Sequence, residues 1–335
     1  MRTSASAAAL ALAALIGSGL GVGIGAGSGE AAESWTGYTY LASDSLPGSS
    51  NLIALAETFS EQTGGEIDLE INLAGSLGIK AADITQSVGS GIVQLAADGF
   101  FLGAIEEGGV LRLPMLFTTR AEFETGLEIM TPYLEEAFAE KNVVLLAQYL
   151  YPLQVAFGTY PIETIDDLKG HKLRVSSPEQ GAFVAAFGGS PVTIGGAEVP
   201  TALQTGVVEG VFTASVGGGR LWKDQLASTY RLGPNFFNSA IIVNKDAYEA
   251  LSPAHQTLLR ELAVDYAAKA TEENMTSEEA TTEELAAGGM EVFEPADGEI
   301  DAAIETMTPY WDEWGESRSE RTRQALGEVK KALGR

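Results

Sequence analysis

The sequence has no cysteine and only two histidines, His171 and His255, in 335 residues. Without cysteine there are no disulfides, thiolate metal ligands or cysteine nucleophiles. A zinc site of several histidines would need both in one place. A site built from carboxylates alone stays open, although no EF-hand spacing is present. We therefore expect no resident cofactor and no metal site, and we leave open whether a metal ion assists ligand binding.

Basic residues are scarce, since 20 Lys and Arg stand against 46 Asp and Glu, for a formal net charge of -26. Such a charge makes nucleic acid and anionic membrane surfaces poor partners. It also repels an anionic ligand, so any anion site must be built from local donors, such as one of the few arginines. The same excess of acid would fit adaptation to high salt, and both explanations remain open.

Long apolar runs are absent beyond the amino terminus. Arg2, the apolar run Ala8–Ile16 and a small-residue tract ending at Ala32 are typical of a secretory signal peptide, residues 1–32. The alternative is a transmembrane anchor, but the apolar run is too short to span a bilayer comfortably. We therefore expect export to the periplasm with cleavage near Ala32.

Apolar residues make up 45% of the chain, enough for a large core. The length exceeds the roughly 250 to 300 residues at which single cores usually split, so two lobes are expected. Strand and helix patterns alternate, which predicts an α/β fold with parallel strand pairing. We predict lobe I from residues 33–151 plus 239–278, and lobe II from residues 152–238 plus 279–335.

Local patterns place the main elements along the chain. Ser252-Pro253 is an N-cap followed by proline at the first helical position, and a helical pattern continues to Ala287. This length is unusual against a mean of about 11 to 12 residues, so the helix could brace both lobes. An acidic helix with Trp311 and Trp314 is expected near the end of the sequence. Strands are expected at 38–41, 92–97, 143–150, 172–175, 241–243 and 290–293.

The stretch Asp166–Ser177 holds the main candidate for a ligand site. Its pattern predicts a short surface helix, a glycine turn and a buried strand with Arg174 opposite Leu173 and Val175. Ligands of open α/β sheets bind at the carboxyl ends of strands, and a guanidinium matches a carboxylate with two parallel hydrogen bonds. A surface ion pair with Asp166 or Asp167 is the alternative.

Further candidates follow strand ends or loops punctuated by glycine or proline. Thr213 follows a strand that ends at Phe212, and Trp222 and Phe236 are the preferred aromatic residues for an apolar wall. Aromatic side chains in such places are more often core than ligand wall. The other aromatic candidates are Phe100, Phe101, Phe212 and Phe237, and the other polar candidates are Ser45, Asp98, Gln154 and Asn238.

Several segments, in this order, resemble the DctP-type substrate-binding proteins of TRAP transporters. They cover essentially the whole chain beyond the expected signal peptide. The segments are Gly75–Gly78, Val88–Ala97, Leu113–Phe117, Asp167–Val175, Ala202–Gly210 and Leu251–Pro253.

The resemblance implies a receptor with a two-lobed, periplasmic-binding-protein-like fold that closes around an organic acid and delivers it to the TRAP membrane permease. It implies that Arg174 binds the ligand carboxylate. The second arginine of sialic-acid-binding members falls on Gln154, and their binding asparagine falls on Thr213. These departures keep the carboxylate class, mono- or dicarboxylate, and leave the ligand itself open. We expect a monomer.

An exported α/β hydrolase-like enzyme is the main alternative. Its nucleophile elbow, Gly-x-Ser-x-Gly, is incomplete in both nearest segments: Gly188–Val192 lacks the final glycine and Ser87–Gly91 lacks the first. A catalytic triad also needs a histidine as its general base, and the sequence has only two candidates. A third class, an adhesive or scaffold protein, would lack a closed cavity between lobes. The sequence therefore favours a receptor without catalytic residues.

Overall fold

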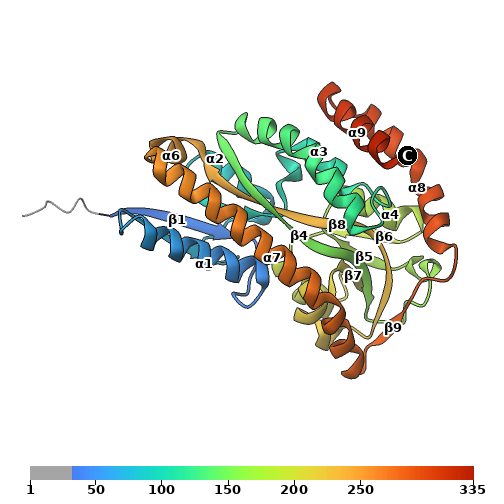
Figure 1. Ribbon diagram of the computed structural model, residues 1–335. Coiled ribbons are helices and arrows are strands. Elements are labelled where there is room, and N and C mark those ends of the chain that lie inside the picture. Colours follow the sequence, from blue (N-terminus) through green and yellow to red (C-terminus); the bar gives the residue numbers. More distant parts are fainter. Residues whose placement is uncertain (1–31) are drawn as a thin grey trace, which may run out of the picture. The chain divides into compact units, whose positions relative to one another are not determined.

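The computed structural model describes residues 32–335, so the expected signal peptide lies outside the described residues except for Ala32. The strands of this part form one mixed sheet in the order β2-β1-β3-β8-β4-β7-β5-β6, and β9 pairs with β8 (Figure 1). Their bounds are β1 Glu33–Thr39, β2 Ile67–Asn72, β3 Leu95–Asp98, β4 Val143–Gly158, β5 Lys172–Val175, β6 Ser190–Thr193, β7 Gly210–Thr213, β8 Ser228–Asn244 and β9 Glu291–Phe293.

The pairing confirms the α/β class. Strand β1 is parallel to β2 and β3, and β5 is parallel to β6 and β7. Between these two parallel groups, β8 and β4 run antiparallel to each other and to their outer neighbours. The site candidates Arg174 and Thr213 stand on adjacent strands of the second group.

The two central strands are far longer than expected, at 16 residues for β4 and 17 for β8. The expectation of short strands at 143–150 and 241–243 is therefore wrong in extent. Pro152 and Pro234 indicate breaks locally, but both lie where the β4–β8 register shifts, around Tyr151 and Gln154. Proline is tolerated there because a bulge removes the ladder hydrogen bond that its missing N–H would donate.

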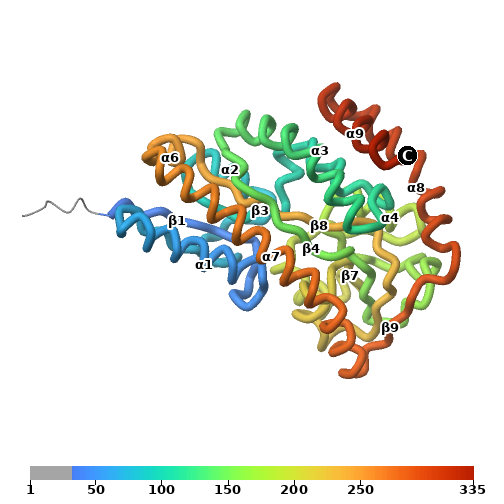
Figure 2. Tube along the Cα trace, in the orientation of Figure 1, coloured from blue at the N-terminus to red at the C-terminus, as the bar shows by residue number. Residues whose placement is uncertain are grey.

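The helices pack on both groups of strands. Their bounds are α1 Pro47–Gln62, α2 Ile84–Gly89, α3 Arg120–Ala139, α4 Pro178–Ala186, α5 Val199–Gln204, α6 Lys245–Ala250, α7 Pro253–Ala287, α8 Glu299–Glu316 and α9 Glu320–Leu333. Helix α7 confirms the predicted 35-residue helix, and the Ser252 Oγ atom caps it by accepting from the His255 N–H at 3.2 Å. It lies beside α1 and crosses β4 (Figures 1 and 2). Leu285, near its end, packs into the cluster that contains Trp222.

Three other expected boundaries are wrong. The first strand is Glu33–Thr39 rather than 38–41. Strand β3 begins at Leu95 rather than Ile92, because Ile92 follows Gly91 (φ +74°) in a turn and is 65% exposed. The expected single terminal helix is two, since the chain turns after Glu316 and Ser319 caps α9 by accepting from the Thr322 N–H at 3.2 Å.

Residues Ala32–Arg335 form one compact unit, and the predicted division into two lobes stays a prediction. Within this range, no helix combines the length and the apolar character that crossing a membrane requires.

Candidate functional site

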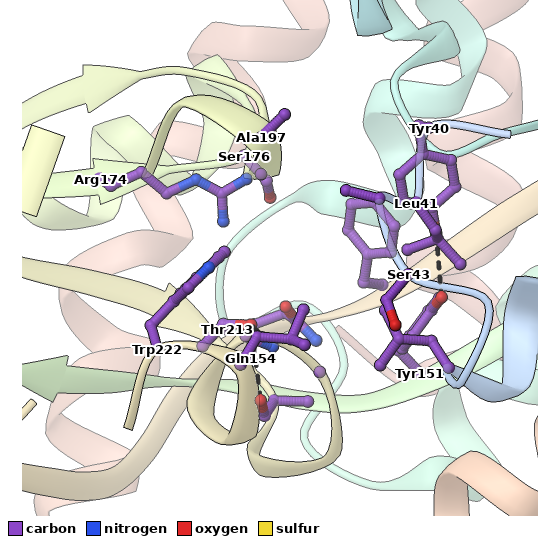
Figure 3. Close-up of a pocket in the computed structure, with 18 of the residues that line it drawn as sticks. Tyr40, Leu41, Ser43, Tyr151, Gln154, Arg174, Ser176, Ala197, Thr213 and Trp222 are labelled. Atoms are coloured by element: carbon purple, nitrogen blue, oxygen red, sulfur yellow. Dashed lines mark hydrogen bonds between the residues drawn. The ribbon is translucent and has the colours of Figure 1, made fainter. Parts of the chain in front are cut away.

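A cavity of about 360 Å³ opens at the carboxyl ends of β5 and β7 (Figure 3). Its walls come from segments that are distant in sequence: the loop after β1, the middle of β4, the ends of β5 and β7, and the turn at 217–222. Its polar lining includes Ser43, Gln154, Arg174, Ser176 and Thr213. This is the place at which open α/β sheets bind ligands.

Arg174 is only 5% exposed, and its guanidinium is fixed by backbone oxygens. Nε donates to the Ile194 carbonyl at 3.0 Å, and Nη1 donates to the Phe212 carbonyl at 3.1 Å. In Figure 3 the head group points into the cavity. Burial lowers the pKa of Arg174 to about 10, against which the Glu198 carboxylate raises it. The side chain therefore stays charged at neutral pH.

The alternative surface role of Arg174 is contradicted. In the described part of the chain, Arg174 has no ion pair with either aspartate. The Asp167 carboxylate instead accepts from the backbone N–H groups of Glu163 at 3.0 Å and Thr164 at 2.9 Å. The predicted helix, a short 3₁₀ turn at Ile165–Leu168, does precede the strand.

Trp222 lies against the guanidinium, whose Cζ atom is 5.8 Å from the ring centroid. Gly218 makes room for this indole, because a Cβ atom at that position would overlap the Trp222 ring. The Gly218 N–H in turn donates to Thr213 Oγ1 at 3.0 Å. The turn thus places an aromatic face and a hydroxyl beside Arg174.

Two further polar side chains are held by the protein. Gln154 Nε2 donates to the Pro152 carbonyl at 2.8 Å, which fixes the orientation of the amide. The Ser176 hydroxyl donates to Gln180 Oε1 at 3.2 Å. Preorganised polar groups of this kind bind a ligand without first losing side-chain freedom.

The wall opposite Arg174 is a cluster of aromatic rings from Tyr40, Phe100, Tyr151 and Phe237. Neighbouring centroids are 5.6 Å apart for Tyr40–Phe100 and for Tyr151–Phe237, and both pairs meet edge to face. The Tyr40 hydroxyl donates to the Tyr151 hydroxyl at 3.1 Å. Burial raises the pKa of both phenols well above the usual value. The wall is therefore uncharged at neutral pH and carries two hydroxyl groups.

Five of the nine residues predicted to bind ligand line this cavity: Arg174, Gln154, Thr213, Trp222 and Phe100. They come from four separate parts of the chain, and the fold brings them together. Whether each contacts a ligand stays a prediction.

Phe236 and Asn238 lie outside the cavity. They flank Phe237 on β8 and point to the opposite face of the sheet, because successive side chains of a strand alternate. Phe236 stacks on Phe123 with centroids 5.2 Å apart, and the Asn238 carbonyls accept from both Nη atoms of Arg112. The sequence favoured Phe236 for the apolar wall, whereas its neighbour Phe237, also a candidate, lines the cavity.

Asp98 and Ser45 also lie outside. Asp98 is buried behind the aromatic wall, where its carboxylate accepts from the Thr85 hydroxyl at 2.6 Å and the Phe100 N–H at 2.8 Å. Burial raises the pKa of Asp98 to about 6, and these hydrogen bonds oppose the rise. Ser45 is exposed and shares a 2.8 Å hydrogen bond with Ser43, which does line the cavity.

Tyr40, Tyr151 and Ser176 line the cavity but were missed by sequence reasoning. Tyr151 and Ser176 follow the ends of two expected strands, so the same rule that found Arg174 could have found them. Tyr40 gave no such signal, because the first strand was expected to run through it.

Neither histidine lines the cavity. His171 Nδ1 is 3.3 Å from Glu209 and His255 Nδ1 is 3.8 Å from Glu66, so the two face different carboxylates. Within residues 32–335, no group of three or more acidic or histidine side chains is arranged to hold a metal ion. No observation supports the hydrolase alternative.

Solved structures of solute receptors have a similar fold. The crystal structure of DctP7, a Bordetella pertussis extracytoplasmic solute receptor binding pyroglutamic acid, has a TM-score of 0.81 at 22% identity and covers 89% of this chain and 100% of its own. A TRAP periplasmic solute-binding protein from Chromohalobacter salexigens with bound D-glucuronate has the same TM-score at 22% identity, covering 89% and 99%. The fold is therefore that of the two-lobed periplasmic solute-binding proteins.

The family model named DctP, bacterial extracellular solute-binding protein, family 7, matches residues 39–317. The chain belongs to this family, and relatives such as the C4-dicarboxylate-binding periplasmic protein DctP of Rhodobacter capsulatus are solute-binding receptors and not enzymes. The ectoine/5-hydroxyectoine-binding periplasmic protein UehA of Ruegeria pomeroyi is 30% identical over 221 residues, which are 62% of this chain and 64% of UehA. The match thus spans somewhat less than two thirds of that relative.

Proposed function

We propose that this protein is the extracytoplasmic receptor of a TRAP transporter, which captures an organic acid through Arg174 and delivers it to the membrane permease. The supporting observation is the guanidinium of Arg174, which is buried, oriented by two backbone carbonyls and directed into the cavity. A charge-assisted hydrogen bond of this kind contributes about 1.5 to 3 kcal/mol net. Because the overall charge is -26, this local donor has to overcome the field of the whole molecule.

The names of the relatives support the same ligand class. Pyroglutamate and D-glucuronate, which those names mention, each carry one carboxylate and no cation, whereas ectoine carries one carboxylate and one amidinium. The identity to the solved receptors is too low to transfer any one of these ligands. The shared feature is the carboxylate, and Arg174 is the residue of this cavity that matches it.

Substitution of Arg174 tests the proposal. Arg174→Ala should weaken binding of an organic acid by about 2 to 5 kcal/mol, because the ligand carboxylate is left buried and unpaired. Arg174→Lys should also fail, since an ammonium cannot reproduce the planar fork. Isothermal titration with acids found by thermal-shift screening measures both, because a ligand that binds only the folded state raises apparent stability.

Arg120→Ala is the matched control, since Arg120 is an exposed arginine on α3 that pairs with Glu124 at 2.7 Å. It should leave affinity unchanged. Tight binding by Arg174→Ala would remove the residue on which the proposal rests.

The proposal also covers the export, oligomeric state, partner and lobes of the receptor. The receptor is exported with cleavage near Ala32, acts in the periplasm as a monomer and meets the permease subunits as its partner. Its lobes are residues 33–151 plus 239–278, and residues 152–238 plus 279–335. Amino-terminal sequencing of exported protein should then begin near Glu33.

A further inference from the structure

Arg174 is the one charged side chain among the described residues that line the cavity. The rest of the polar lining consists of hydroxyl groups, one amide, the indole of Trp222 and backbone. No lysine, histidine, aspartate or glutamate of residues 32–335 takes part in it. The ligand therefore meets a single positive charge and no negative one.

Other charges near the cavity are enclosed by the protein. Arg112 is fully buried behind Phe237, with its Cζ atom 4.2 Å from that ring centroid, and Asn238 accepts its hydrogen bonds. Asp98 is buried behind Phe100, with both carboxylate oxygens hydrogen-bonded. Neither side chain reaches the lumen.

Glu198 is the acid that raises the pKa of Arg174. Its carboxylate is exposed outside the cavity, where it accepts from the Gly195 N–H at 3.0 Å. It weakens the attraction of Arg174 for any anion, and it is not among the residues that line the cavity.

A second carboxylate on the ligand would lie against neutral aromatic rings. It would lack a cation there and would also meet the repulsion of the acidic protein. Burying an unpaired charge costs several kcal/mol, so the lining discriminates against dianions.

A ligand ammonium would be buried without a carboxylate partner. Cation–π contact with the aromatic residues could compensate if their faces were free. Arg112 already lies over the Phe237 ring and Arg174 over the Trp222 ring. The rings of Tyr40, Phe100 and Phe237 meet one another edge to face or tilted, at centroid distances of 5.6 to 6.3 Å. They form a packed cluster rather than an open cage.

We propose that the ligand is a monocarboxylate with a net charge of -1 and an uncharged, partly apolar body, and that the cavity rejects dicarboxylates and zwitterions. This inference rests on the proposed function. The carboxylate binds Arg174, and the body lies along the aromatic wall. Neutral polar groups of the body meet the amide of Gln154 and the hydroxyls of Thr213 and Tyr151. Specificity arises because the lining has no second cation to pair with a second carboxylate and no carboxylate to pair with a ligand ammonium.

The test compares three charge classes in one calorimetric and thermal-shift panel of organic acids on the purified exported protein. Pyroglutamate, proline and glutarate are size-matched members, with net charges of -1, 0 and -2. The best monoanion should bind at least about 10-fold more tightly than any dianion or zwitterion, because the extra charge of those ligands is left unpaired. A zwitterion or dianion that binds as tightly as the best monoanion, through Arg174, would overturn the inference and leave the proposed function standing.

Gln154→Lys supplies the second cation that the lining lacks. It should raise the affinity for glutarate relative to the best monoanion by about 10-fold, whereas Gln154→Leu should not. Circular dichroism checks folding, and Ser43→Lys at the cavity rim replaces the first variant if it does not fold. An unchanged ratio in a folded lysine variant would contradict the inference. If no acid in the panel binds, or binding is independent of Arg174, the proposed function itself is wrong.

Discussion

Asp98 shows how burial sets the behaviour of a single residue behind the binding wall. Its pKa rises from 3.8 to about 6 in the folded protein because the carboxylate is desolvated. Its folded-state pKa exceeds the unfolded value, so its contribution to stability is full below about pH 4. That contribution is lost as the pH rises through 6. Ionisation of Asp98 thus destabilises the native state at neutral pH.

The consequence is measurable with Asp98→Asn. Between pH 4 and 7, the free energy of unfolding of the native protein should fall relative to the variant by up to about 3 kcal/mol, the equivalent of the rise in pKa. Urea denaturation across this range gives the difference. Asp44→Asn, at an exposed position, is the control and should show no such trend. A difference for Asp98→Asn that is constant with pH would contradict the argument.

At the residue scale, two candidates that lie at strand ends do line the cavity. The candidates Phe236 and Asn238, which lie within a strand, point to the opposite face of the sheet. Arg174 and Thr213 lie at the carboxyl ends of β5 and β7, which are short strands with clear boundaries. Phe236, Phe237 and Asn238 are consecutive on β8, so a shift of one residue along the strand changes which of these side chains faces the cavity. The register depends on the bulges between β4 and β8, which arise from tertiary pairing. No local sequence pattern encodes these bulges.

At the scale of elements, α7 fixes the turn that carries the cavity lining. Glu278 on α7 accepts from the backbone N–H groups of Ser215 and Val216, each at 3.0 Å. Arg231 on β8 donates to Glu278 at 2.9 Å and to the Ser215 hydroxyl at 2.9 Å. This turn leads into Trp222, so the long helix positions the site from behind.

Glu278→Gln should therefore lower both stability and affinity. The amide keeps the shape but can no longer accept at both positions, and Arg231 loses its charged partner. The free energy of unfolding should fall by about 1.5 to 3 kcal/mol, the range for hydrogen bonds to charged groups. Chemical denaturation and titration with the monocarboxylate from the screen measure the two effects.

Glu279→Gln is the control, since the neighbouring Glu279 is exposed and should change neither quantity. A loss of stability in Glu278→Gln with affinity intact would show that Glu278 holds the fold but does not position the site.

Elements whose ends carry local sequence signals were predictable, and elements whose ends depend on tertiary pairing were not. Helix α7 was predicted at both ends because Ser252, Pro253 and Gly288 are local signals for capping and termination. Strands β4 and β8 extend well beyond the apolar runs 143–150 and 241–243, because the sheet accepts Pro152 and Pro234 at bulges that arise from tertiary pairing. The two terminal helices were merged because the cap at Ser319 was not recognised.

For the whole molecule, the lining residues divide between the two predicted lobes. Tyr40, Phe100 and Tyr151 belong to the first lobe, and Arg174 and Trp222 belong to the second. The β4–β8 register shifts lie at the predicted crossing near Tyr151 and Asn238, where the ladder is irregular and bending disrupts few hydrogen bonds. A ligand that binds both walls would draw the lobes together about this point.

We therefore expect ligand to reduce the radius of gyration. Small-angle X-ray scattering, with and without a saturating monocarboxylate, measures the change, and Arg174→Ala under the same conditions should stay at the unliganded value. The reduction depends on contacts to both walls, because a ligand shifts a conformational equilibrium only by its difference in affinity for the two states. An unchanged radius at saturation would instead mean a rigid, preformed cavity, and the two predicted lobes would then not move as separate bodies.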